Sequence, residues 1–97
     1  MTPDELNFFK GNHIKLTVDD ENLDLVSAKD IAKKKAKELN ADPMLLSWFC
    51  GITGEFYPKA ECGRMDKPVW IVFAESRDAD IAININDGEY IFLYLST

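Results

Sequence analysis

The feature that most constrains the fold is a pair of apolar segments near the carboxyl end, "DIAININ" and "EYIFLYL", separated by Asp87-Gly88. An Asp-Gly pair between such segments is typical of a β-hairpin with a two-residue type I′ turn. That turn forms three cross-strand pairs on one face of the hairpin: Ile85 with Tyr90, Ile83 with Phe92 and Ile81 with Tyr94. The other face carries Ala82, Ile91, Leu93 and Leu95. Because both faces are apolar, both need to be covered.

Further strands are predicted upstream of this hairpin. Periodicity and composition indicate four of them, at His13–Asp19, Met44–Phe49, Glu55–Tyr57 and Val69–Ala74. The segment Met44–Phe49 could instead be a helix opened by Asp42-Pro43, but the Gly-Ile-Thr-Gly that follows favours a strand entering a hairpin. Pro58 ends the third strand, because proline cannot donate to a sheet. The continuously apolar Val69–Ala74 is predicted as a central strand covered on both sides.

Two helices are predicted in the first half of the chain. Ser27, with Asp30 three residues later, marks the start of a helix that runs to Leu39 with apolar residues at helical spacing. A short helix from Thr2-Pro3 to about Lys10 precedes the first strand. Together these elements predict a single α+β domain over residues 1–97. It has two layers, a mainly antiparallel sheet of about five or six strands with one main helix packed on it, and the short N-terminal helix.

One main helix covers only one face of such a sheet, so one apolar row of the last strand is left over. We predict that this row, Ile91, Leu93 and Leu95, lies in the interface of a homodimer or beneath the N-terminal helix.

The charge balance argues against a nucleic-acid partner. The chain has 17 acidic and 11 basic residues, a formal net charge of −6 at pH 7, which is the wrong sign for neutralising phosphates over a broad surface. No apolar run reaches the ~18 residues of a membrane span, and the amino end resembles no export signal. We therefore expect a cytoplasmic protein without a membrane or nucleic-acid partner.

The main helix gives this acidic protein a basic surface. Five lysines lie on its outer faces: Lys29, Lys33, Lys34, Lys35 and Lys37. A solvated helix face is the favoured interpretation, and an anion or an acidic partner is the alternative.

Cys50 and Cys62 are the first candidates for chemistry. A structural zinc site needs about four N or S ligands, whereas the chain holds two cysteines and one histidine. A second copy of the chain, or a carboxylate such as Glu61, could complete a metal site, and a disulfide across the predicted hairpin is also open. The favoured interpretation is that Cys50 is a small apolar residue of the sheet and that Cys62 is a half-exposed loop thiol, the more reactive of the two. We expect no metal and no cofactor.

The second candidate is the loop "ESRDAD", Glu75–Asp80, between two predicted strands. Glu75, Arg77 and Asp80 could hold a ligand or act as acid and base. A solvated turn with an Arg–carboxylate pair is the favoured alternative. Trp48 joins the candidate binding residues because an aromatic ring with one N–H serves well as an anchor in a core or an interface. No catalytic residue is predicted.

Four stretches carry a resemblance to a known family: "DPMLLSW", the pattern Pro58-x-x-Glu61-Cys62, Trp70 with the following "AESR", and "INDGEYIFLYL". On these residues, Leu25 to Leu95 resembles a small family of uncharacterised proteins of about this length from anaerobic bacteria and archaea. The resemblance implies an α+β fold and a site region, without an assigned activity. Members carry a cysteine pair where this chain has Cys62-Gly63, which weakens an inherited metal or redox role.

The sequence thus favours a small non-catalytic binding or interaction module, because no catalytic set of residues is complete. The alternative is a small thiol- or metal-dependent enzyme with a site near Cys62 and the Glu75–Asp80 loop.

Overall fold

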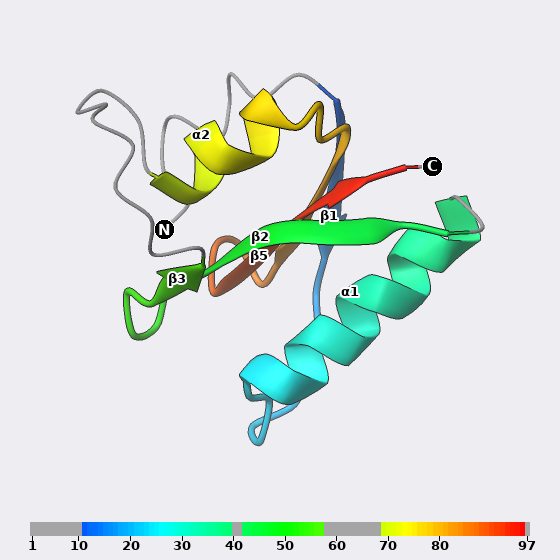
Figure 1. The fold of residues 1–97 in the computed structure, drawn as a ribbon. Coiled ribbons are helices and arrows are strands. Elements are labelled where there is room, and N and C mark those ends of the chain that lie inside the picture. Colours follow the sequence, from blue (N-terminus) through cyan, green and yellow to red (C-terminus); the bar gives the residue numbers. More distant parts are fainter. Residues whose placement is uncertain (1–10, 40–41, 58–68, 97) are drawn as a thin grey trace.

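A five-stranded sheet lies between two helices in the computed structural model of the protein, which describes residues 11–39, 42–57 and 69–96 (Figure 1). The strands are β1 (Asn12–Leu16), β2 (Met44–Cys50), β3 (Phe56–Tyr57), β4 (Ile81–Ile85) and β5 (Tyr90–Leu95). The helices are α1 (Leu25–Leu39) and α2 (Val69–Ser76). The strand order is β1-β4-β5-β2-β3, with β1 parallel to β4 and the other neighbours antiparallel. The predicted α+β class and mainly antiparallel sheet are confirmed, and the predicted N-terminal helix lies outside the described residues.

The β4–β5 hairpin has the predicted register. Three cross-strand pairs form as expected: Ile85 with Tyr90, Ile83 with Phe92 and Ile81 with Tyr94. The turn is longer than the predicted Asp87-Gly88 pair, since β4 ends at Ile85 and β5 begins at Tyr90, and φ is positive at Asn86, Asp87 and Gly88. Asn, Asp and Gly are the residues that adopt this backbone region most readily. The predicted strands at Met44–Phe49 and Glu55–Tyr57 are also confirmed, as β2 and β3.

The segment Val69–Ala74, predicted as a central strand, is instead most of helix α2. The buried residues of α2 are Trp70, Ile71 and Ala74, and their spacing puts them on one side of a helix. A continuous apolar run of this length fits a buried helix as well as a buried strand, so periodicity cannot separate the two. The strand prediction is therefore wrong.

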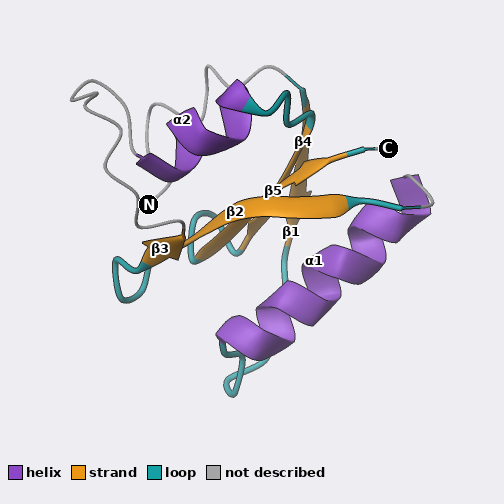
Figure 2. Cartoon of the chain, viewed as in Figure 1, coloured by secondary structure: helices purple, strands orange, loops and turns teal. Residues whose placement is uncertain are grey.

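Helix α2 covers the aliphatic face of the sheet, and α1 covers the aromatic face (Figure 2). Trp70, Ile71 and Ala74 of α2 pack in one core cluster with Ile91 and Leu93 of β5. The sheet thus has a helix on each face, and the predicted two-layer arrangement is not confirmed, because Val69–Ala74 belongs to a helix that covers the second face. The aliphatic row lies beneath α2, so an uncovered face no longer supports a homodimer, which stays a prediction.

Helix α1 approaches the sheet through a row of small residues. Ala28, Ala32 and Ala36 are fully buried against the aromatic face. The helix begins at Leu25, and the carboxylate of Asp24 accepts a hydrogen bond from the backbone N–H of Ser27 at 2.8 Å. Asp24 is therefore the N-cap, and the predicted start at Ser27 is wrong because Ser27 already lies in the first turn.

Replacing Asp24 by alanine is expected to lower the unfolding temperature by a few degrees, because the cap is lost. Hydrogen bonds from Ser27 hold the pKa of Asp24 below its ordinary value of 3.8. A carboxyl group with a lowered folded-state pKa stabilises the fold above its unfolded-state pKa, and this stabilisation is lost as the pH falls through the folded-state value.

Asp24→Asn removes the negative charge of this side chain but keeps the helix cap, since Asn is also a good N-cap. In thermal unfolding, the advantage of the wild type over Asp24→Asn is expected to shrink as the pH falls below 3.8. A difference that does not change between pH 7 and pH 2 contradicts this account of Asp24.

Candidate binding groove

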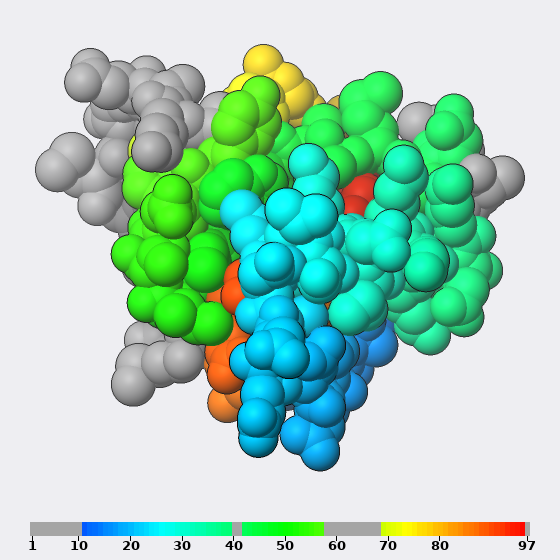
Figure 3. Space-filling view, turned by 90° about the horizontal axis from the view of Figure 1, so that it is seen from below, coloured from blue at the N-terminus to red at the C-terminus, as the bar shows by residue number. Residues whose placement is uncertain are grey.

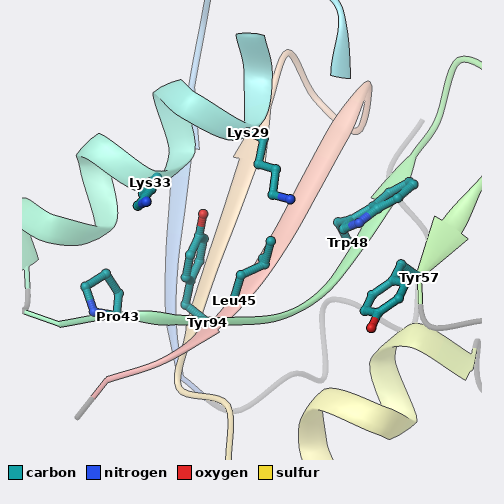
Figure 4. Close-up of a pocket in the computed structure, with 7 residues that line it drawn as sticks. All are labelled: Lys29, Lys33, Pro43, Leu45, Trp48, Tyr57 and Tyr94. Atoms are coloured by element: carbon teal, nitrogen blue, oxygen red, sulfur yellow. The ribbon is translucent and has the colours of Figure 1, made fainter. Parts of the chain in front are cut away.

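A groove opens between α1 and the strands β2 and β3 (Figures 3 and 4). Its volume is about 570 Å³, within the range of roughly 300–1,000 Å³ that is common for small-ligand sites. Seven residues line it: Lys29, Lys33, Pro43, Leu45, Trp48, Tyr57 and Tyr94. In Figure 3, atoms of β5 are visible between α1 and β2. The groove is thus built from segments that lie far apart in the sequence.

Trp48 and Tyr57 form an aromatic wall at one end of the groove (Figure 4). The two residues face each other across β2 and β3, which places both side chains on the same side of the sheet. Their ring centroids are 6.4 Å apart and the ring planes differ by 15°. Trp48 is half-buried, whereas Tyr57 is 54% exposed. Two nearly parallel, accessible rings give a surface on which another planar ring can stack.

Two lysines of α1 line the opposite side of the groove. Lys29 and Lys33 are four residues apart, which puts them about 6 Å from each other along the helix axis. The neighbouring lysines are engaged, because Lys34 pairs with Asp30 at 3.2 Å and Lys35 with Glu38 at 3.7 Å. Neither Lys29 nor Lys33 forms an ion pair with another described residue. Within this part of the chain, the groove therefore carries two uncompensated positive charges.

Tyr94 lies beside Leu45, its cross-strand partner on β2. The side chain of Tyr94 is buried, and its hydroxyl points toward α1 on the side of the two lysines (Figure 4). Burial raises the pKa of Tyr94 to about 12. The hydroxyl therefore stays protonated at neutral pH and can donate a hydrogen bond to an acceptor in the groove.

The predicted Glu75–Asp80 loop lies on the other side of the sheet, next to α2. Glu75 and Asp80 line a smaller hollow of about 330 Å³ together with Asp78 and Ala79. The carboxylate of Asp80 accepts hydrogen bonds from the backbone N–H of Ser96 at 2.9 Å and from the Ser96 hydroxyl. This carboxylate thus has a structural role, holding the end of β5 against the start of β4.

Arg77 and Trp48 lie in different parts of the structure. The Arg77 guanidinium lies 3.7 Å above the centre of the Phe73 ring and donates to the Ser76 hydroxyl at 3.1 Å. Trp48 packs with the cluster that faces α1, whereas Ala74 and Ala79, on either side of Arg77, belong to the cluster that faces α2. The predicted binding residues therefore divide between two faces of the sheet.

Cys50 is a free, buried residue of β2, as the sequence predicted. Cys62 and Glu61 lie outside the described residues. Among residues 11–39, 42–57 and 69–96, no group of three His, Cys, Asp or Glu side chains could hold a metal ion. No helix in the same residues is long and apolar enough to cross a membrane.

Residues 11–94 match the family model described as a domain of unknown function, DUF5619. The chain belongs to this family. Its structure is similar to the crystal structure of "a novel non-family-model protein", AF1514 from Archeoglobus fulgidus DSM 4304, with a TM-score of 0.77 and 30% sequence identity. That match covers 90% of this chain and 95% of the archaeal chain. No curated protein matches the sequence.

All seven residues that line the groove lie within the part that matches DUF5619. The predicted resemblance to a family of unknown function is confirmed. Membership assigns no activity, so a functional proposal has to come from the groove itself.

Proposed function

We propose that this member of DUF5619 is a small non-catalytic binding module whose ligand is a small organic anion held in the groove. The observation that carries the proposal is that Lys29 and Lys33 line the same groove as the stacked rings of Trp48 and Tyr57. Apolar walls with a few converging polar groups are typical of ligand sites. The positive charges select an anion, and the rings favour a ligand with apolar surface.

The acidic character of the whole protein does not oppose this proposal. The net charge is −6, but at physiological salt a charge is screened over about 8 Å. A ligand in the groove therefore responds mainly to Lys29 and Lys33, while the nearby Asp30 carboxylate is already paired with Lys34. A long polyanion would also meet the acidic remainder of the surface, so a small ligand fits better.

The alternative of a small enzyme near the Glu75–Asp80 loop gains no support from the described residues. Asp80 is held by Ser96, and Arg77 lies on Phe73. The cytoplasmic location and the homodimer stay predictions.

A fluorescent aromatic anion tests the proposal directly. The dye 1-anilinonaphthalene-8-sulfonate becomes fluorescent against apolar protein surface, and we expect the folded protein to bind it in the groove. Lys33→Glu is expected to raise the dissociation constant of the dye about tenfold or more, because an attractive charge becomes a repulsive one. The measurement is a fluorescence titration of each variant at fixed ionic strength.

Lys15→Glu is the matched control for this titration. It changes the net charge by the same amount at an exposed residue of β1, at the opposite edge of the sheet from β3, and Lys15 does not line the groove. We expect its dissociation constant to stay within about twofold of the wild type. An equal loss in both variants contradicts the proposal, because the dye would then be sensing the net charge of the protein.

A further inference from the structure

We infer that the groove selects a nucleoside 5′-monophosphate, with its base against Trp48 and Tyr57 and its phosphate next to Lys29, Lys33 and the Tyr94 hydroxyl. The inference rests on the proposed function and narrows its ligand class. Three features carry it: the number of charges, the hydrogen-bond donors, and the separation of the rings from one of the lysines.

The polar side of the groove matches a phosphate monoester better than a carboxylate. Lys29 and Lys33 have no ion-pair partner among the described residues, so together they can balance about two negative charges. A phosphate monoester carries about −1.5 to −2 at pH 7 and has three strong acceptor oxygens. Two ammonium groups and the Tyr94 hydroxyl supply donors for all three oxygens. A carboxylate brings about one charge and would leave one lysine uncompensated.

The aromatic wall lies at one end of the groove, and Lys33 and Pro43 lie toward the other (Figure 4). Leu45 lies between these ends, where it offers apolar surface. A ligand that uses both ends therefore needs a planar ring and an anionic group joined by a spacer. A nucleoside monophosphate has this layout, since the sugar separates its base from its phosphate. Stacking on Trp and Tyr accepts any nucleobase, so the base itself is left open.

The experiment compares three sets of probes by isothermal titration calorimetry: the monophosphates AMP, GMP, CMP and UMP, their nucleosides, and ribose 5-phosphate. We expect at least one monophosphate to bind about tenfold or more tightly than both ribose 5-phosphate and its own nucleoside, because only it reaches both ends of the groove. If no monophosphate binds more tightly than ribose 5-phosphate, the inference is overturned.

Two variants then assign the ends of the ligand. Trp48→Ala is expected to remove the advantage of the monophosphate over ribose 5-phosphate while leaving ribose 5-phosphate binding unchanged. Lys33→Gln is expected to reduce its advantage over the nucleoside, with Lys29 and the Tyr94 hydroxyl left to face the phosphate. Tyr57→Ala, at an exposed position of the same wall, replaces Trp48→Ala if that variant folds poorly. A monophosphate that keeps its full advantage in the wall variant and in Lys33→Gln also overturns the inference.

The inference and the proposed function fail in different ways. The groove could bind the dye in a Lys33-dependent manner without preferring monophosphates. That result supports the proposed binding module and overturns only the inferred ligand class. If Lys33→Glu leaves the dissociation constant of the dye unchanged, the proposed function itself is contradicted.

Discussion

Replacing Leu93 by glutamate is expected to prevent stable folding. Leu93 is fully buried in β5, between its neighbours Ala82 on β4 and Ser47 on β2, and beneath α2. An unpaired carboxylate in this position costs several kcal/mol. The total stability of a domain of this size is about 5–15 kcal/mol. We therefore expect Leu93→Glu to lose the cooperative unfolding transition that circular dichroism detects in the wild type.

Val26→Glu is the control for this experiment. It introduces the same charge on an aliphatic position that is 77% exposed, and we expect a change in unfolding free energy of no more than about 0.5 kcal/mol. The result also bears on the position of α2. If Leu93 faced a second subunit instead of α2, Leu93→Glu would give a folded monomer with a normal transition, and that outcome contradicts the fold described above.

The second large effect is expected at Trp70. This side chain is 2% exposed and its ring stacks on Phe49, with centroids 5.0 Å apart and planes within 11°. Truncating a buried tryptophan to alanine removes its burial and leaves a cavity, which costs about 3–5 kcal/mol. Urea unfolding of Trp70→Ala measures this loss as a lower midpoint with an unchanged slope.

Trp48→Ala provides the internal comparison, because the same substitution is made at a half-buried ring on the groove. We expect it to cost about 1 kcal/mol, close to an average substitution. A Trp48→Ala variant that is as unstable as Trp70→Ala would contradict the half-buried position of Trp48 on the groove, and the test of the aromatic wall would then rest on Tyr57→Ala.

The carboxyl-terminal hairpin could be predicted in detail because local and long-range signals agree there. Asp87-Gly88 fixes the position of the turn, and the alternation of Ile with aromatic residues fixes the register. The helix α2 could not be predicted in the same way. Its apolar run has no strand or helix period, and what makes it a helix is the aliphatic sheet face formed by Ile91 and Leu93, which a local pattern does not contain.

The sequence predicts only part of the groove. It indicates Trp48 as a binding candidate, but its partner Tyr57 follows from the register of β2 and β3, which no single residue specifies. Lys29 and Lys33 were seen only as members of a basic surface. Helical spacing could not show which lysines remain unpaired, because Asp30 lies three residues before Lys33 and four before Lys34, and only the structure shows that it pairs with Lys34.

The position of Tyr94 in the groove could not be predicted without the order of the whole sheet. Its side of the hairpin was predicted, but its place in the groove comes from β2, which pairs Leu45 with it, and from α1 above it. Sequence pattern places such a residue on a face, and only the packed fold shows that its hydroxyl has lysines nearby.

The most direct test of the binding groove is an amide chemical-shift titration with whichever of the four nucleoside monophosphates binds most tightly. The account predicts that the largest shifts fall on the groove residues of α1, β2, β3 and β5: Lys29, Lys33, Leu45, Trp48, Tyr57 and Tyr94. Amides of the Glu75–Asp80 loop, on the other face of the sheet, are expected to stay in place. Saturable shifts that gather at Glu75–Asp80 contradict the account of the groove, and no saturable shifts with any of the four overturns the inference of a nucleoside monophosphate.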